Sequence, residues 1–331
     1  MSKVILTGIK PTGTPHLGNY FGAIKPAIEM SKNDEFNAYF FIADYHALTT
    51  VQDAKALNYG ILDLACTWLA CGLDPNKITL YKQSDIPETF ELSTILTNVT
   101  PKGLMNRAHA YKAMVEKNQE NGEDEDANIN MGLYSYPILM TADILLFNTK
   151  YVPVGLDQKQ HVEIARDIAG YFNHKFGKTL VVPEEIVSEK VATIPGLDGR
   201  KMSKSYGNVI PLFCDENTLK KLINRIVTDS TTPDEPKSTD SFIFKLYELF
   251  ATEDESNEMR MKFEKGISWG EAKRILFEKA NEYISPMREK YNYYMAHPEI
   301  VKEILINGAK KARPIAKETI ARVRKAIGCD L

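Results

Sequence analysis

The chain has 331 residues, of which 44% are hydrophobic and 26% charged, as expected of a globular protein with a sizeable core in one large or two smaller domains. The formal net charge of −3 excludes a global attraction to nucleic acid, so any RNA contact must come from local basic patches. No apolar run approaches the roughly 20 residues of a membrane span, the N-terminus is too short for a signal peptide, and the four cysteines form no Cys-x-x-Cys pair, which together predict a cytoplasmic protein with reduced thiols.

Short apolar runs alternate with amphipathic segments through the first two hundred residues. The pattern predicts strands at 3–8, 37–43, 78–82 and 151–154, and helices at 17–30, 53–71, 87–98, 131–148 and 157–173. Strands separated by helices indicate a parallel sheet, in which ligands bind beyond the carboxyl ends of the strands. After Ser205 the strand signal fades, and helices are predicted at 217–228, 240–251, 269–294 and 297–308. We therefore predict an α/β fold: a doubly wound, Rossmann-like nucleotide-binding domain over 1–207 and an all-helical domain over 208–331.

The first chemical motif is Pro15-His16-Leu17-Gly18-Asn19, which follows the first predicted strand and a glycine-containing loop. It opens a predicted helix, whose first N–H groups are available to an anion. His16 and Asn19 add side-chain donors at the same end, and Gly18 permits close approach of the backbone. The motif predicts a phosphate-binding helix start.

The second motif is Lys201-Met202-Ser203-Lys204-Ser205, in a loop with several nearby glycines. Two lysines around two hydroxyls suit a mobile arm that closes over a triphosphate. Alone, the first motif could be an ordinary turn and the second a solvated loop. Their coincidence in this order predicts a site that holds and breaks a nucleoside triphosphate.

A third pattern places Tyr136, Met140 and Asp143 on one helix face, at i, i+4 and i+7, among apolar neighbours. A carboxylate in such surroundings requires a donor, and the indole N–H is donor-only. A thioether suits contact with an aromatic ring. From spacing alone, Asp143 could equally cap a neighbouring helix or pair with a lysine.

The two motifs resemble the signatures of the class I aminoacyl-tRNA synthetases. Five further segments resemble the tryptophanyl-tRNA synthetases in particular, so that the resemblance extends over essentially the whole chain: 8–13, 41–47, 136–145, 152–161 and 307–313. The resemblance implies ATP-dependent activation of L-tryptophan to tryptophanyl-adenylate, followed by transfer to tRNA(Trp) with AMP and diphosphate as products. It also implies Mg²⁺ arriving with ATP, a helical anticodon-binding domain and a homodimer.

The resemblance assigns roles to individual residues. The implied catalytic residues are His16, Asn19, Lys201 and Lys204. The implied ATP-binding residues are Lys10, Thr12, Gly18, Asn19, Lys112, Asp157, Met202, Ser203 and Lys204. The implied tryptophan-binding residues are Leu6, His46, Tyr136, Met140, Asp143, Val152, Val154 and Gln158. No metal site made of protein ligands is expected, because the histidines lack the spacing of a metal motif.

Two departures from the family pattern concern the nucleotide. Lys10 stands where many bacterial relatives carry Gln, and the segment around Lys112 lacks a second lysine. For tRNA, the C-terminal stretch is basic, although basic helices are often merely solvated. Its candidate contacts are Lys310, Lys311, Arg313, Lys317, Arg322, Arg324 and Lys325.

Three other functions compete with this interpretation. A tyrosyl-tRNA synthetase is the nearest, because a phenol O–H could also donate to Asp143; the Met140 face and the 152–158 segment favour tryptophan. A small cofactor nucleotidyltransferase would have no use for a long helical domain. A non-catalytic RNA-binding paralogue is disfavoured by the intact residues of the two motifs, His16, Gly18, Lys201 and Lys204.

Overall fold

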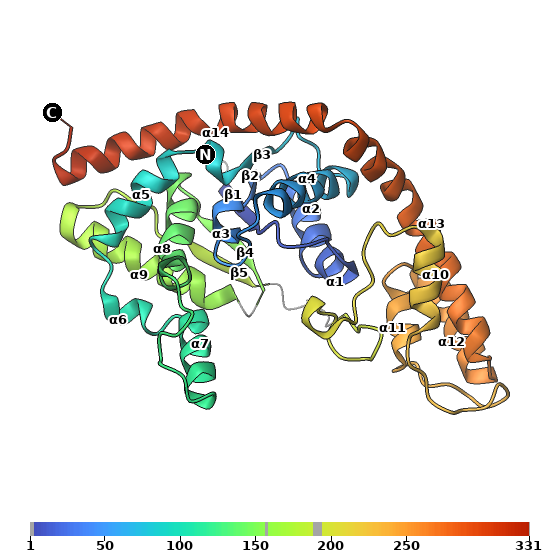
Figure 1. Ribbon diagram of the computed structural model, residues 1–331. Helices are drawn as coiled ribbons and strands as arrows, with labels where there is room; N and C mark the ends of the chain where they lie inside the picture. Colours follow the sequence, from blue (N-terminus) through green and yellow to red (C-terminus); the bar gives the residue numbers. More distant parts are fainter. Residues whose placement is uncertain (1–2, 156–157, 188–193, 331) are drawn as a thin grey trace.

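The structure, a computed structural model, describes residues 3–155, 158–187 and 194–330. Its centre is a five-stranded, entirely parallel sheet in the order β3-β2-β1-β4-β5 (Figure 1). The strands are β1 (Lys3–Ile9), β2 (Phe36–Ile42), β3 (Thr79–Lys82), β4 (Tyr151–Val154) and β5 (Glu184–Val187). The predicted doubly wound parallel sheet is confirmed. The polar edge strand β5 was not predicted, because its two glutamates mask the apolar signal of a buried strand.

The topology of the sheet sets the position of a ligand. β1 lies at the centre, paired along its length with β2 and at Ile5 with β4. The chain winds outward from β1 in one direction through β2 and β3, and in the other through β4 and β5. At such a reversal the connections leave on opposite faces, which opens a crevice at the carboxyl ends of the strands.

Helices cover the sheet and follow the predicted segments closely. The elements after β1 and β2 are α1 (Leu17–Asn19), η1 (Tyr20–Ile24), α2 (Lys25–Ser31), α3 (Asp44–Ala47) and α4 (Ala54–Ala70). Those after β3 and β4 are η2 (Gln83–Asp85), α5 (Glu88–Thr97), α6 (Lys102–Met105), α7 (His109–Glu120), α8 (Met131–Leu146) and α9 (Lys159–Phe176). The predicted 17–30 helix contains a π-helical turn, η1. The short α6 and the polar α7 had not been predicted.

The second part of the chain is helical, as predicted. After the short η4 (Lys204–Tyr206), it contains α10 (Glu216–Asn224), α11 (Phe242–Glu248), α12 (Glu253–Lys265), α13 (Trp269–Ala296) and α14 (Pro298–Ile327). α12 had not been predicted, and the helix expected at 297–308 continues to Ile327. Within the described residues, no helix combines the length and apolarity needed to cross a bilayer.

α14 crosses the molecule from the helical group at one end to α5 at the other (Figure 1). Gly308 permits its close approach to β3, because a Cβ at this position would lie 1.7 Å from the carbonyl oxygen of Leu80. Farther along, the buried Ala312, Ala316 and Ile320 join the core of the first part of the chain. The last helix therefore packs on the sheet domain, and the boundary between 207 and 208 stays a prediction.

Several of the basic residues proposed to face tRNA instead contact the first part of the chain. The Arg313 guanidinium donates to both carboxylate oxygens of Glu88, at 2.9 to 3.3 Å. Arg324 donates to Glu91 at 2.6 and 2.7 Å. Arg322 donates to the Asn148 side chain at 2.6 Å. These contacts support a structural role for the three arginines, while RNA binding by this helix stays a prediction.

Candidate active site

A cavity of about 540 Å³ lies at the carboxyl ends of β1 and β4. Its wall comes from β1, the loop after it, α8, β4 and the start of α9, and Lys204 reaches it from the second motif. It brings together the predicted site residues Leu6, Lys10, Thr12, Asn19, His46, Tyr136, Met140, Asp143, Val152, Val154, Gln158 and Lys204. Residues from both sequence motifs thus meet at the crevice that the topology predicts.

The first motif forms a reciprocal cap at the start of α1. The Nδ1 of His16 accepts the Asn19 backbone N–H at 3.3 Å, and the Asn19 side-chain oxygen accepts the His16 backbone N–H at 3.1 Å. Because Nδ1 is an acceptor, a neutral imidazole carries its proton on Nε2. Burial, together with the positive charge of Lys204, lowers the pKa of His16 from 6.5 to about 4. His16 is therefore a neutral donor at physiological pH.

Lys204 places an ammonium beside the loop that precedes α1. Its Nζ donates to the Thr12 carbonyl at 2.7 Å. The loop turns at Gly13, where φ is +68° and a Cβ would lie 3.1 Å from the same Nζ. The left-handed backbone and the close lysine both favour glycine here. Burial lowers the pKa of Lys204, while the negative charge of Asp63 opposes that shift.

The rest of the second motif is held by Asn208. Its side-chain oxygen accepts the Ser203 backbone N–H at 2.8 Å, and its amide donates to Asp198 and to the Lys201 carbonyl. Met202 is buried beneath α1, with its sulfur 3.4 Å from the Gly18 nitrogen.

Some predicted site residues lie apart from the wall of the cavity. Among the described residues, those that surround the cavity do not include His16, Gly18, Lys112, Lys201, Met202 or Ser203. His16 and Gly18 belong to the same helix start as Asn19. Lys112, in contrast, is exposed on α7, and its Nζ lies 4.0 Å from a carboxylate oxygen of Glu116. Asp157 lies outside the described residues.

The opposite end of the cavity contains a buried carboxylate. One oxygen of Asp143 lies 2.8 Å from the Nε2 of His46, and the Gln83 amide donates to both oxygens at 2.9 and 3.0 Å. Burial raises the pKa of Asp143, and the hydrogen bonds from His46 and Gln83 oppose that shift. The partners are thus a histidine and an amide, rather than the lysine or helix start that spacing left open.

Gln83 was missed from the sequence. It lies in η2, directly after β3, and its side-chain oxygen accepts the backbone N–H of Tyr45 at 3.2 Å and of His46 at 3.4 Å. Gln83 is fully buried. Its hydrogen bonds orient His46 and occupy part of the hydrogen-bonding capacity of the Asp143 carboxylate. Its position at the carboxyl end of a parallel strand was the one signal that could have revealed it.

A second polar cluster joins α8 to α9. The Tyr136 hydroxyl is hydrogen-bonded to the Nε2 of His161, whose Nδ1 lies 2.8 Å from the Gln158 side-chain oxygen. His161 lines the cavity and had not been predicted as a site residue, although it ends the 152–161 segment. Apolar residues complete this end of the cavity: Leu6, Met140, Val152 and Val154.

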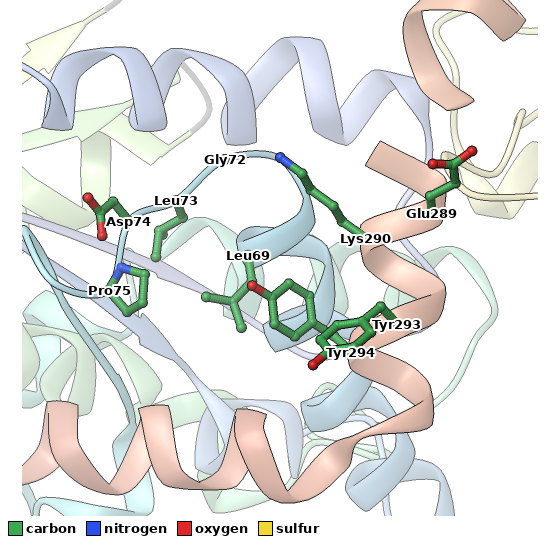
Figure 2. A pocket seen from close by; sticks show the side chains of 9 residues that line it. All are labelled: Leu69, Gly72, Leu73, Asp74, Pro75, Glu289, Lys290, Tyr293 and Tyr294. Carbon is green, nitrogen blue, oxygen red and sulfur yellow. The ribbon is translucent and has the colours of Figure 1, made fainter. Parts of the chain in front are cut away.

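A second hollow, of about 480 Å³, lies between the end of α4 and the end of α13. Figure 2 shows its side chains, among them Leu69, Asp74, Lys290 and Tyr293. None of the predicted site residues lines it. The cavity at the sheet is therefore the candidate active site.

Comparisons with known proteins agree with these features. A family model described as tRNA synthetases class I (W and Y) matches residues 2–285. A tryptophan–tRNA ligase from Pseudomonas aeruginosa is 53% identical over 99% of this chain and 74% of its own length. One from Neisseria meningitidis is 52% identical over 98% of both chains. The fold is similar to a tryptophanyl-tRNA synthetase from Campylobacter jejuni complexed with ADP and tryptophan, with TM-score 0.91, 46% identity and coverage of 98% of this chain and 99% of that one.

Proposed function

Because the chain belongs to the tryptophanyl-tRNA synthetases, a family of class I aminoacyl-tRNA synthetases, we propose that the cavity at the sheet is its activation site. The enzyme activates L-tryptophan with ATP to tryptophanyl-adenylate and transfers the tryptophanyl group to tRNA(Trp), with AMP and diphosphate as products. One observation carries the assignment of the site: Asn19 and Lys204 from the two motifs share a single cavity with the buried Asp143.

In activation, the tryptophan carboxylate attacks the α-phosphorus of ATP in line, and the bond to the diphosphate leaving group breaks. No general base is needed, because the carboxylate is already ionised. Negative charge grows on the leaving diphosphate, where preorganised donors have their largest effect. We assign this role to the Nε2–H of His16, the Asn19 amide and the ammonium groups of Lys201 and Lys204. The neutral state of His16 and the position of Lys204 beside Thr12 support the assignment.

The same proposal assigns the nucleotide to the loop before α1 and the second motif. Lys10, Thr12 and Asn19 line the cavity at this end, and Gly18 contacts Met202 behind it. Ser203, Lys112 and Asp157 complete the set that the family resemblance suggests.

For tryptophan, we propose that Asp143 accepts the indole N–H. A carboxylate has about four acceptor positions, and the hydrogen bonds from His46 and Gln83 leave capacity for one more donor. Tyr136 and Gln158 would hold the ammonium. Leu6, Met140, Val152 and Val154 would contact the indole ring. The tyrosyl alternative has less support, because the relatives at about half identity are named tryptophan–tRNA ligases.

In the second step, the terminal ribose 2′-hydroxyl of tRNA attacks the carbonyl carbon of the adenylate. The bond between the carbonyl carbon and the phosphate oxygen breaks, the proton of the hydroxyl passes to the leaving phosphate, and AMP leaves. We propose that the helical part of the chain contacts the anticodon, that the enzyme works as a homodimer and that it acts in the cytoplasm; family membership is the support for all three.

Mg²⁺ would neutralise charge on the triphosphate. Among the described residues, no group of three or more His, Cys, Asp or Glu side chains is arranged to hold a metal ion. We therefore propose that Mg²⁺ enters with ATP and is held by phosphate oxygens and water.

ATP–pyrophosphate exchange with each standard amino acid tests the proposed function, and tryptophan should support exchange far above the others. Lys204→Ala should slow single-turnover adenylate formation about a hundredfold, with tryptophan binding nearly unchanged. Lys178→Ala is a suitable control, because Lys178 is exposed and outside the cavity. Exchange with tyrosine instead of tryptophan, or a full rate for Lys204→Ala, would refute the corresponding assignment.

A further inference from the structure

Asp63 is a buried carboxylate that the activation chemistry does not use. It lies in the middle of α4 and only 1% of its surface is exposed. An isolated ionised carboxylate is costly to bury, so its partners identify what it stabilises. α4 passes directly under the loop before α1, since a Cβ at Gly60, one turn earlier, would lie 2.6 Å from the Pro11 carbonyl oxygen.

The partners of Asp63 come from separate parts of the chain. The Tyr291 hydroxyl, on α13, donates to one carboxylate oxygen at 2.7 Å. Burial raises the pKa of Asp63, while hydrogen bonds from Tyr291 and Thr14 and the positive charge of Lys204 oppose the shift. Thr14 belongs to the loop before α1. A single carboxylate thus connects α13 to that loop, and its charge acts through space on the ammonium of Lys204, which is hydrogen-bonded to Thr12 of the same loop.

Further contacts of α13 stabilise the position of Tyr291. Tyr291 stacks on Phe213, with ring centroids 4.7 Å apart and planes at 29°. Two helical turns earlier on the same face, the Tyr283 hydroxyl lies 3.0 Å from the hydroxyl of Tyr20, the residue that follows Asn19. α13 therefore contacts both Tyr20, next to the first motif, and Asp63, under the loop to which Lys204 is hydrogen-bonded.

We propose that Asp63 and Tyr291 form a positioning pair that holds the Lys204 ammonium beside Thr12, ready for the triphosphate, and ties its placement to helix α13. The inference rests on the proposed role of Lys204 in activation. Asp63 reaches no substrate in this scheme and acts through the lysine. The negative charge of Asp63 attracts the Lys204 ammonium and favours its protonated form. The hydrogen bond from Tyr291 fixes the carboxylate in place.

Asp63→Asn tests the pair most directly, because it preserves shape and hydrogen bonding while removing the charge. Single-turnover adenylate formation should slow about tenfold, with the KM for tryptophan unchanged. In a Lys204→Ala background the same substitution should have almost no further effect, because residues that act as a unit are not additive. A purely structural role would slow both backgrounds equally.

Tyr291→Phe provides a second variant in case Asp63→Asn fails to fold. It retains the ring stack on Phe213 and removes only the hydroxyl, so we expect a smaller loss of about threefold. Tyr293→Phe is the matched control, because Tyr293 is exposed on the same helix. It should match the wild type.

The pH profile gives an independent readout. The titratable groups that interact with Lys204 are Asp63 and His16, and those around Asp63 are Tyr291 and Cys66. Removing the Asp63 charge lowers the pKa of Lys204 further, so the alkaline limb of the activation rate should move to lower pH in Asp63→Asn.

The outcomes separate the two proposals. If Lys204→Ala retains the full activation rate, the proposed role of Lys204 is wrong. If Lys204→Ala is slow but Asp63→Asn and Tyr291→Phe both match the wild type, or if Asp63→Asn is equally harmful in both backgrounds, the positioning pair is refuted while the proposed function stands.

Discussion

The Nε2 of His46 lies 2.8 Å from a carboxylate oxygen of Asp143, and both residues are buried at one end of the cavity. With Gln83 as a second donor, the carboxylate is oriented before any substrate arrives. A site built around a fixed acceptor rejects analogues that lack the matching donor more strongly than an apolar pocket rejects a change of size.

Asp143→Asn should therefore impair recognition of tryptophan. The amide would be a weaker, uncharged acceptor, or would place its N–H groups against those of Gln83 and the indole. We expect kcat/KM for tryptophan to fall by a factor that corresponds to about 1.5–3 kcal/mol of lost transition-state stabilisation, with the KM for ATP much less affected. Kinetics with an analogue that lacks the ring N–H provide the control: wild type should use it poorly, and the variant should lose most of its discrimination. Equal use of both substrates by wild type would contradict the role of Asp143.

The depressed pKa of His16 can be measured by NMR with labelled histidine, using His16→Gln to identify its resonance. We expect a pKa of about 4 in the wild type, caused first by burial and then by the charge of Lys204. In Lys204→Ala the pKa should rise. A value of 6.5 in both proteins would contradict the buried, neutral histidine.

The same shift predicts a pH dependence of stability. Between about pH 4 and 6.5 the unfolded chain binds a proton at His16 that the folded chain does not, so stability is complete above pH 6.5 and decreases as the pH falls through this window. His16→Gln should reduce the difference between the free energies of unfolding at pH 5 and pH 7, measured by urea denaturation. An unchanged difference would exclude His16 as its source.

Arg313→Ala should destabilise the fold, because Glu88 is 8% exposed and would lose its bidentate partner. We expect a loss of about 1–3 kcal/mol in the free energy of unfolding. Lys310→Ala, at an exposed position on the same helix, should change it by less than about 0.5 kcal/mol. Unchanged stability combined with weaker tRNA binding in Arg313→Ala would instead favour an RNA contact.

Gly308→Ala should weaken the docking of α14, because the new Cβ would meet the backbone of Leu80 rather than a movable side chain. We expect a cost of about 3 kcal/mol or more in the free energy of unfolding. Gly270→Ala is the matched control: it lies in α13 with open space around its Cβ position, so it should be neutral or stabilising by up to about 1 kcal/mol. Similar effects of the two substitutions would contradict the close contact.

The parts of the fold that sequence patterns predicted well are those set by local chemistry. Strands such as β2 are largely apolar, and α1 begins where His16 and Asn19 can cap each other. The patterns failed where distant parts of the chain decide the structure. The close approach of α14 to β3 at Gly308, for example, joins residues that are far apart in the sequence.

The candidate site divides in the same way. Its residues could be named from spacing and family resemblance, and most of the predicted site residues line one cavity, although Asn19 and Lys204 are the assigned residues of the two motifs that do so. Gln83, His161 and Asp63 were missed, because each acts through partners that the fold supplies. Asp63 and Tyr291 are 228 positions apart, and no local pattern records such a contact.

β3 is an edge strand of the sheet, and α14 lies against its backbone at Leu80. An uncovered edge strand is a template for pairing with other chains. During synthesis this strand emerges long before the helix that covers it. Nascent chains and fragments that stop before Pro298 would therefore expose the unpaired backbone N–H and C=O groups of β3. Translation errors that truncate the protein should therefore produce aggregation-prone species rather than soluble, partly active ones.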